Sequence, residues 1–400
     1  MGMHGYKQWA CLMALAGVLG SALAQSNDPL RIGLIGPLTG PSADFGVPMI
    51  NGAKLAIDEI NAAGGYLGRP MELVIKDDAG EPDVGLQRSK ELVKDGLVAT
   101  IGFCNTGVAL KSLEVFQTAK LPLIVPCATG TPITAMYPAP ESYIFRTAAR
   151  DAIQAPFVVN DIVARGWTRV AMFADKTGYG EAGLQDALKA LAAKNIKPVY
   201  VARFALGVKD LQSELKAAQA AGANVIFSFT VGQENAVIAL GRQALGWKVT
   251  QVGAWPLSFP YFIDGAKDAA EGALMAQTFI AEPSNERRSA FLSAYARKYK
   301  TKKITVPMAA VQAYDTVYLL SYAILAIRNG DLSGPSVKAA LENMPRIYYG
   351  VAATHEHPFS KDDKDAITSN MLVMGMVKNG AVTFAYPQDR TRNLFVKRKR

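Results

Sequence analysis

The sequence predicts an α/β protein with two lobes, each a parallel-rich sheet covered by helices. The 400 residues are 50% hydrophobic, which is enough for more than one core at roughly 100–200 residues per domain. Short β-type runs alternate with amphipathic helical segments, and alternating units of this size form a parallel sheet with helices on both faces. The alternation occurs in two series, separated by the segment 131–142 with its three prolines.

The first series lies between residues 31 and 126. Ile50, Ala53, Ile57 and Ile60 are spaced three or four residues apart, which indicates one apolar helical face, and Gly64-Gly65 ends that helix. We expect strands at 31–35, 71–77, 97–102 and 121–126, and helices at 46–63, 83–95 and 106–119.

The second series begins after Arg150. We expect helices at 151–165, 179–194, 209–221 and 232–245, and strands at 168–174, 197–203, 223–229 and 248–254. Helices near 285–299, 308–328 and 334–343 and a β-rich stretch at 371–377 follow, so the chain is expected to return to the first lobe and later to the second. The expected division is 25–147 plus 279–350 for lobe 1, and 148–278 plus 351–392 for lobe 2.

The first 24 residues have the pattern of an export signal. Lys7 precedes an apolar run over 9–19, and Ser21-Ala22-Leu23-Ala24 places small residues at alternate positions before a cleavage site. The run is shorter than a membrane-spanning helix requires, and Cys11 precedes most of it, which argues against a lipid anchor. We therefore expect a signal peptide over 1–24, cleavage near Ala24 and a periplasmic protein.

The mature chain is basic, with 42 Lys and Arg residues against 34 Asp and Glu residues once Lys7 is removed. Much of the excess lies in the last eleven residues, which include Arg390, Arg392 and the basic tail 393–400. A basic tail can bind nucleic acid or acidic lipid. On an exported protein we interpret it as a solvated tail and expect no nucleic-acid partner.

The reactive side chains argue against an enzyme. Apart from the signal, the histidines are His355 and His357, whose spacing does not place two imidazoles on one helical face as a zinc site requires. The sequence contains no serine-nucleophile, phosphate-loop or dinucleotide-binding glycine motif; Gly33-Leu34-Ile35-Gly36 resembles only a fragment of the last. We expect no catalytic residue, no metal and no cofactor.

Candidate binding residues lie where the predicted strands of the first lobe end. Ligands of open α/β sheets bind beyond the carboxyl ends of the strands, and the turns there are 37–40, 104–107 and 127–130. Asn105 or Thr106 can cap the next helix, whose first N–H groups then point into the cleft and stabilise an anion by about 0.5–2 kcal/mol. The turn of Cys127, Ala128 and Thr129 adds a hydroxyl donor. A carboxylate could bind here without an arginine, and ordinary helix capping is the alternative interpretation.

Cys104 and Cys127 end strands that we expect to be neighbours. Neighbouring strands lie about 4.8 Å apart, close to the Cα separation of a disulfide. In an oxidising compartment a disulfide and two reduced thiols both remain open, whereas a nucleophilic cysteine would need a histidine that the sequence does not place nearby.

The second lobe presents aromatic residues near its predicted strand ends. Tyr179 follows the turn 175–178, and Phe229, Thr230 and Trp255 lie at the ends of later strands. Tyr179, Phe229 and Trp255 could form an aromatic wall of the cleft, and ordinary core packing is the alternative.

At these residues the sequence resembles the type I periplasmic solute-binding proteins of ABC importers, in the leucine/isoleucine/valine-binding family. The resemblance runs from about residue 30 to residue 380. The motifs that carry it are Arg31–Gly40 (RIGLIGPLTG), the segment from Gly52 to Gly65, Asp77-Asp78, Leu121–Ala128 (LPLIVPCA), Phe145-Arg146-Thr147 and the Tyr179-Gly180 turn.

The resemblance implies two Rossmann-like lobes joined by three hinge crossovers, with the ligand cleft between them. Matched motif by motif, Asn105-Thr106 and Cys127–Thr129 correspond to the family's carboxylate-binding turns. Phe45 corresponds to an aromatic residue that lines the pocket, and Tyr179 to one that closes over the ligand. Cys104 matches a half-cystine whose usual partner position holds Gly80 here, which leaves Cys127 as its partner.

The sequence departs from the family at Trp255-Pro256, where the amino-acid binders carry a glutamate that pairs with the ligand's ammonium group. An ammonium enclosed without an acidic partner is costly to desolvate. Asp44, Asp175 or Glu234 could replace that glutamate. We therefore expect a small carboxylate ligand, either an aromatic acid without an amine or a branched-chain or other apolar amino acid.

The predicted function is that of a monomeric receptor that captures this ligand by lobe closure and delivers it to an ABC permease in the inner membrane. A ligand sensor of the same fold without a transport role is the alternative. A secreted hydrolase is disfavoured because it would need a nucleophile and a base that the sequence does not pair.

Overall fold

The computed structural model describes residues 28–392. The predicted signal peptide (1–24) and the basic tail (393–400) lie outside these residues. Among the helices of the described part, none is long and apolar enough to cross a membrane.

The first sheet contains five parallel strands in the order β2-β1-β3-β4-β5. They are β1 (Leu30–Gly36), β2 (Met71–Asp77), β3 (Thr100–Ile101), β4 (Leu123–Val125) and β5 (Ile144–Arg146). The helices α1 (Ala43–Ala62), α2 (Pro82–Leu92) and α3 (Thr106–Ala119) connect successive strands, and the short α4 (Pro132–Ala135) precedes β5. Side-by-side parallel strands joined through helices are the arrangement that the sequence predicts.

Alternating side chains of β1 explain why both faces of this sheet are covered. Ile32 and Leu34 belong to a buried cluster with residues of α1 and of α11 (Pro307–Leu325), whereas Ile35 belongs to a second cluster with residues of α2 and α3. Successive side chains of a strand point to opposite faces, so each face buries its own apolar layer.

The second sheet contains seven strands in the order β14-β13-β10-β9-β8-β6-β7. They are β6 (Val170–Asp175), β7 (Tyr200–Phe204), β8 (Val225–Phe229), β9 (Thr250–Gly253), β10 (Leu274–Gln277), β13 (Val373–Lys378) and β14 (Ala381–Phe384). The first five are parallel to one another, and β13 and β14 add an antiparallel edge next to β10.

Helices again cover both faces of the second sheet. Val170, Met172 and Ala174 of β6 pack with residues of α5 (Asp151–Ala164) and α6 (Gly178–Ala192). The intervening Ala171 and Phe173 pack with residues of α7 (Gln212–Ala220) and α8 (Glu234–Ala244). Near the cleft, the chain forms a 3₁₀ turn, η1 (Trp255–Ser258), followed by α9 (Pro260–Ala266) and a second turn, η2 (Lys267–Ala270).

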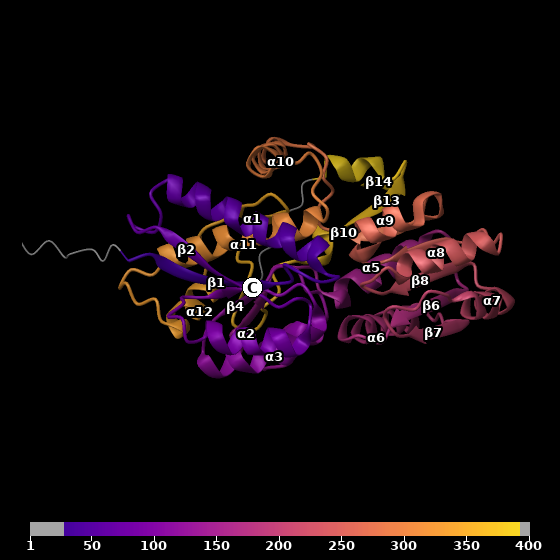
Figure 1. Cartoon of the computed structure of the whole chain (residues 1–400), viewed down its shortest axis with the longest axis horizontal. Coiled ribbons are helices and arrows are strands. Elements are labelled where there is room, and N and C mark those ends of the chain that lie inside the picture. The colour runs from indigo at the N-terminus through magenta and orange to yellow at the C-terminus, as the bar shows by residue number, and fades with distance from the viewer. Residues whose placement is uncertain (1–27, 393–400) are drawn as a thin grey trace, which may run out of the picture.

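The chain passes between the two sheets three times. It crosses from β5 to α5, returns after β10 to α10 (Glu286–Tyr299), α11 and α12 (Gly334–Glu342), and crosses again after the hairpin of β11 (Tyr348–Tyr349) and β12 (Thr354–His355). Figure 1 shows the result as two lobes: the orange helices α11 and α12 lie with the indigo and purple first lobe, and the yellow β13 and β14 lie with the second. The predicted α/β architecture with three crossovers is confirmed.

Several element boundaries differ from those expected. The strands predicted at 97–102 and 121–126 are only two and three residues long in the structure, at 100–101 and 123–125. The β-rich stretch near 371–377 is a short turn, η3 (Ser369–Met371), followed by β13, and the final turn η4 (Pro387–Arg390) was not expected. Around β3, the N–H groups of Val98 and Gly102 still bond to the neighbouring segments, but the regular ladder covers only two residues.

Candidate functional site

A small cavity lies where the carboxyl ends of the two parallel sheets face each other. Its volume is about 10 Å³, no more than one water molecule requires. Both lobes contribute to its wall, which is formed by Phe45, Cys104, Thr106, Thr129, Tyr179, Val231, Trp255, Pro256 and Phe259. Ligand pockets typically hold about 300–1,000 Å³, so the lobes are closed on each other and must separate to admit a ligand.

The N-terminus of α3 forms part of the cavity wall on the side of the first lobe. The N–H of Ala109 makes the first intrahelical hydrogen bond, to the carbonyl of Asn105, so the three preceding N–H groups have no partner within the helix. The Thr106 hydroxyl accepts a hydrogen bond from the N–H of Gly130 at 3.2 Å. The expectation that Asn105 or Thr106 caps the helix with its side chain is wrong, because the Asn105 amide instead donates to the Ser42 hydroxyl at 2.9 Å.

The Thr129 turn is held from behind by a buried arginine. Arg146 Nη1 donates to the carbonyls of Thr129 and Gly130 at 3.0 and 2.7 Å, and its Nε donates to Asp365 Oδ1 at 2.6 Å. Arg146 is fully buried, and its ion pair with Asp365 joins the turn to the segment of the third crossover. Arg146 therefore fixes the backbone of the turn, and Thr129 lines the cavity while its hydroxyl donates to Asp151 Oδ2 at 3.2 Å.

The two cysteines of the first lobe are bonded. Cys104 and Cys127 form a disulfide with a Cα–Cα distance of 4.6 Å, and so cross-link the turns that follow β3 and β4. Of the two alternatives left open by the sequence, the structure contains the disulfide. Cys104 contributes to the cavity wall, whereas Cys127 is buried behind it.

The N-terminus of α6 faces that of α3 across the cleft. A β carbon placed on Gly178, the first residue of α6, would lie 3.2 Å from the Cα of Gly107 in α3. The Thr177 hydroxyl caps α6 by accepting from the N–H of Gly180 at 3.3 Å. Both helices therefore direct their partial positive ends toward the same gap, an arrangement that favours an anion.

Tyr179 brings a donor without a protein partner into the cavity wall. Its hydroxyl is buried and makes no hydrogen bond in the described structure. Burial raises its pKa well above the usual value, and the charges of Asp151 and Asp175 raise the pKa further. The phenol therefore stays neutral and can donate a hydrogen bond to a ligand.

Asp151, the first residue of α5, lies directly behind the Thr129 hydroxyl. Thr129 Oγ1 is 3.2 Å from Asp151 Oδ2, and Gln154 Nε2 is 3.1 Å from Asp151 Oδ1. Burial, followed by the repulsion of Asp186, raises the pKa of Asp151 to about 8, although the Thr129 hydrogen bond and Arg146 act in the opposite direction. Sequence reasoning missed this carboxyl group, because its apolar surroundings are created only when the lobes fold.

Aromatic rings fill the remainder of the cavity wall. Phe45 of α1 stacks on Phe259 at a centroid distance of 5.2 Å, and Trp255 meets Phe259 edge-on at 4.9 Å. Phe45 and Trp255 were expected here, whereas Phe259, Val231 and Pro256 were not. The spacing of four residues between Trp255 and Phe259, close to one helical turn, is the signal that could have identified Phe259.

Five other predicted residues do not line the cavity. Phe229 packs beneath Tyr179 at a centroid distance of 5.8 Å, and the Thr230 hydroxyl is bonded to Glu234. Ala128 and Cys127 are buried in the first lobe without contributing to the cavity wall. Asn105, whose amide is bonded to Ser42, is likewise absent from it. Of the three aromatic residues predicted to line the cleft, Tyr179 and Trp255 do so, together with Phe45 and Phe259. The third, Phe229, packs beneath Tyr179 in the core.

The carboxylates considered as partners for an ammonium group are directed elsewhere. Asp175 accepts hydrogen bonds from the N–H groups of Thr177 and Val231, both at 2.9 Å. Glu234 accepts from the N–H of Gly207, and Asp44 is exposed. None of the nine wall residues, within the part of the chain that the structure describes, carries a carboxylate.

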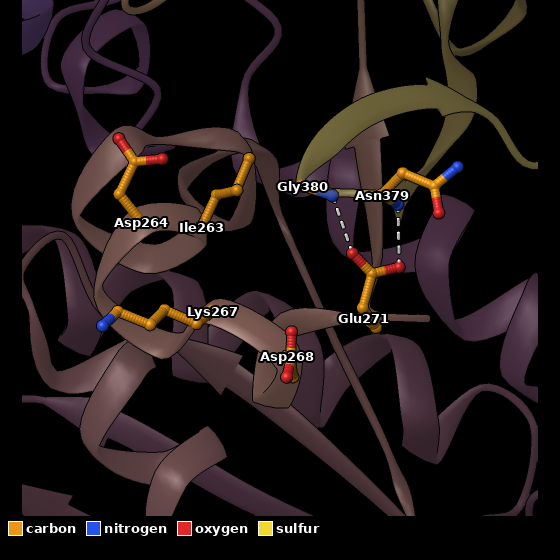
Figure 2. Close-up of a pocket in the computed structure, with 7 residues that line it drawn as sticks. All are labelled: Ile263, Asp264, Lys267, Asp268, Glu271, Asn379 and Gly380. Carbon is orange, nitrogen blue, oxygen red and sulfur yellow. Dashed lines mark hydrogen bonds between the residues drawn. The ribbon is translucent and has the colours of Figure 1, made fainter.

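A cavity of about 600 Å³ is on the second lobe and shares no residue with the cleft. In Figure 2 the Glu271 carboxylate points toward the β13–β14 turn, where it accepts from the N–H groups of Asn379 and Gly380 at 2.9 and 2.7 Å. Glu271 therefore caps a turn. Residues 28–392 contain no cluster of His, Cys, Asp and Glu suited to a metal ion.

Comparisons with known proteins agree with this geometry. Residues 29–381 match the family model of the periplasmic binding proteins. Leu/Ile/Val-binding protein homolog 3 of Brucella melitensis is 31% identical over 83% of this chain and 88% of its own length. A leucine-, isoleucine-, valine-, threonine- and alanine-binding protein of Pseudomonas aeruginosa is 28% identical over 68% of this chain and 73% of its own length.

Solved structures share the fold at lower identity. A type 1 periplasmic binding protein from Bordetella pertussis superposes with a TM-score of 0.80 at 22% identity, covering 89% of this chain and 99% of the other. A solute-binding protein from R. palustris in complex with benzoate superposes with a TM-score of 0.75 at 20% identity, covering 89% and 95%. The chain therefore belongs to the type I periplasmic binding proteins, in the branched-chain amino-acid-binding family, whose members bind solutes and are not enzymes.

Proposed function

We propose that this chain is the solute-binding component of an ABC transporter and that its ligand is a small aromatic carboxylate without an amine. The observation that carries the proposal is the composition of the cavity wall between the lobes. That wall combines hydroxyl donors and aromatic rings, and among its described residues there is no carboxylate.

The donors of the wall suit a carboxylate. The N-termini of α3 and α6 converge on one gap, and Thr106, Thr129 and Tyr179 line the cavity beside them. The Tyr179 hydroxyl has no partner in the described structure, whereas the Thr129 hydroxyl, which donates to Asp151, would have to turn to the ligand. A hydrogen bond to a charged group contributes about 1.5–3 kcal/mol. A micromolar dissociation constant corresponds to about 8 kcal/mol, so a few such bonds together with apolar burial are sufficient.

The rings of the wall suit an aromatic ligand. Phe45 belongs to one lobe and Phe259 to the other, and they are in stacking contact when the lobes are closed. Separation of the lobes exposes both ring faces, and an aromatic acid inserted between them would replace that contact with two others. Proteins of the same fold have been solved in complex with benzoate and with 4-hydroxybenzoate, which supports the proposal that this fold can bind such acids.

An amino-acid ligand is less consistent with this wall. Its ammonium group would be enclosed against Trp255, Pro256 and the neighbouring rings without a carboxylate partner, at a cost of several kcal/mol. The relatives named for leucine, isoleucine and valine binding make apolar amino acids the natural comparison ligands.

The remaining parts of the proposal concern delivery. We propose that lobe 1 (25–147 plus 279–350) and lobe 2 (148–278 plus 351–392) close as rigid bodies about the three crossovers. In this proposal the closed form docks as a monomer on an inner-membrane permease. Export to the periplasm would follow from cleavage near Ala24, which N-terminal sequencing of the secreted protein tests.

Isothermal titration of the purified mature protein tests the ligand class. Benzoate and 4-hydroxybenzoate are compared with leucine, isoleucine and phenylalanine at one pH and ionic strength. We expect micromolar or tighter binding of at least one aromatic acid and much weaker binding of the amino acids. Tight leucine or isoleucine binding with no binding of aromatic acids contradicts the proposed ligand class but not the transport role.

A further inference from the structure

A second cavity, of about 470 Å³, lies outside the cleft and is lined by four arginines. Arg287 and Arg288 come from the first turn of α10, and Arg390 and Arg392 come from the end of the described chain. The rest of its wall is formed by residues 349–354 of the β11–β12 hairpin, Ser284, Asn285, Glu286 and Thr391. No residue of this cavity belongs to the cleft wall.

The positive charge of this cavity is only partly neutralised. Arg390 is paired with Glu282 at 2.8 Å and Arg392 with Asp389 at 3.6 Å. Within the described residues, neither Arg287 nor Arg288 has a carboxylate oxygen within 4.0 Å. With Arg390 and Arg392 paired, Arg287 and Arg288 face one acidic residue of the wall, Glu286, so an excess of one positive charge remains.

Arg288 is the buried member of this group of arginines. Its side chain lies over the ring of Phe279 at 5.2 Å and donates from Nη1 to the Ser284 hydroxyl at 3.1 Å. The residue is only 5% exposed, and its buried Nε has no hydrogen-bond partner. Burial lowers the pKa of Arg288, while the attraction of Asp315 and Glu282 opposes that shift. A buried guanidinium with an unused donor is costly to the fold, which indicates a partner anion.

Backbone donors of α10 lie beside these guanidinium groups. The Asn285 side chain caps the helix by accepting from the N–H of Arg288 at 3.0 Å, and Ser289 makes the first intrahelical bond. The N–H groups of Glu286 and Arg287 come before that bond, so they have no partner within the 14-residue helix. The N-terminus of a helix of this length favours an anion in addition to the arginines.

We propose that this cavity is a second ligand site, which binds a phosphate group. A phosphate carries up to two negative charges and accepts paired hydrogen bonds from guanidinium forks. A carboxylate offers two acceptor oxygens, whereas a phosphate offers enough oxygens to accept from Arg287, from the unused Nε of Arg288 and from the first N–H groups of α10 at the same time. The phosphate could come from a small dissolved molecule or from the headgroup of an anionic lipid at the membrane where the permease resides.

The position of the cavity connects the site to lobe movement. α10 packs against α1 of the first lobe, whereas Arg390 and Arg392 follow β14 of the second sheet. A bound phosphate that contacts both groups of arginines would hold the lobes in one relative position. Occupancy of the site should therefore change the affinity of the cleft for its own ligand.

Titration of the mature protein with pyrophosphate tests the site, in low-salt buffer free of other phosphate. Arg287→Gln and Arg288→Gln remove the two guanidinium groups that lack a carboxylate partner. Arg297→Gln removes the same charge from the last turn of the same helix and is the matched control. Arg287 is exposed, so Arg287→Gln remains informative if the buried Arg288 variant does not fold.

We expect pyrophosphate to bind with a dissociation constant below about 1 mM. The affinity should fall about tenfold or more in Arg288→Gln and several-fold in Arg287→Gln, and should not change in Arg297→Gln. The proposal that the site binds a dissolved phosphate compound would be overturned by either of two results. One is no measurable pyrophosphate binding to the wild-type protein, and the other is an equal loss of affinity in Arg287→Gln and Arg297→Gln.

Co-sedimentation with vesicles distinguishes the source of the phosphate. Binding to phosphatidylglycerol vesicles but not to phosphatidylcholine vesicles, reduced by Arg287→Gln, supports a lipid headgroup. Binding of pyrophosphate without vesicle binding supports a small dissolved molecule. Absence of both contradicts the proposal. Because the cleft ligand is not used in either assay, failure here leaves the proposed transport function untouched.

Discussion

Gly107 and Gly178 meet across the closed cleft, and the contact is asymmetric. A β carbon on Gly178 would lie 3.2 Å from the Cα of Gly107, whereas a β carbon on Gly107 would come no closer than 4.0 Å to Gly178. The two helix N-termini therefore approach each other a few tenths of an ångström more closely than a side chain at residue 178 would allow.

Alanine at position 178 should interfere with closure. Gly178→Ala is expected to weaken ligand binding several-fold, since the lobes must stay a few tenths of an ångström further apart, while helix propensity at this position improves. Gly107→Ala makes only ordinary van der Waals contact and is the matched control. Isothermal titration measures both affinities, and small-angle scattering with ligand measures closure. Equal affinities in the two variants would show that this contact does not limit closure.

The Thr129 hydroxyl should contribute directly to ligand binding. Thr129→Val removes a hydroxyl from the cavity wall and is expected to lower carboxylate affinity about tenfold or more. Thr230→Val is the control, because Thr230 is also bonded to a carboxylate but does not line the cavity. If Thr230→Val lost as much affinity as Thr129→Val, Thr230 would contact the ligand, as the sequence predicts, and the cavity wall in the structure would be wrong.

Asp151 should make binding and stability depend on pH. Because its pKa is raised to about 8, it remains largely protonated at neutral pH. Ionisation above pH 8 places a negative charge behind Thr129 and should weaken carboxylate binding between about pH 7 and pH 9. Asp151→Asn should remove this pH dependence. Asp83→Asn, which changes an exposed carboxylate, should retain it.

The same carboxyl group should also contribute to the pH dependence of stability. The folded pKa of Asp151 is raised above its value of about 3.8 in the unfolded chain. Its stabilising contribution is thus fully present below pH 4 and is lost as the pH rises to about 8, by at most about 1.4 kcal/mol per pH unit. The difference in unfolding free energy between wild type and Asp151→Asn should follow this window. A difference that is constant with pH contradicts the assignment.

The Arg146–Asp365 pair should be essential to the fold. Arg146→Met removes the anchor of the Thr129 turn and leaves Asp365 buried, so we expect a loss of about 3–5 kcal/mol. Arg88→Met breaks the partly exposed pair with Glu91 and should cost less than about 1 kcal/mol. Chemical denaturation of both variants measures the difference. A small loss for Arg146→Met would mean that Arg150, at 3.2 Å from Asp365, is a sufficient partner.

Much of the fold could be predicted because its signals are local. The apolar spacing of Ile50, Ala53 and Ile57 indicates the helix that the structure contains as α1, and the repeated alternation indicates two parallel sheets. The short strands β3 and β4 and the turn η1 were harder to delimit. Their ends depend on the neighbouring strand and on the opposite lobe, neither of which is visible in a local pattern.

The site could be predicted only in part, because its wall depends on direction as well as position. Phe45, Thr106, Thr129, Tyr179 and Trp255 were identified and line the cavity. Phe229 and Thr230 are at a strand end, as expected, but their side chains face the core and Glu234. Phe259 was missed because it lies beyond the last strand-end motif, and Asp151 was missed because a carboxyl group at a helix start is ordinarily solvated.

A crystal structure of the mature protein with 4-hydroxybenzoate tests the central claim most directly. We expect the carboxylate within hydrogen-bond distance of the first N–H groups of α3 and of the Thr129 hydroxyl, with the ring between Phe45 and Phe259. A carboxylate directed away from those N–H groups, or a ligand bound outside the cleft, would contradict the account.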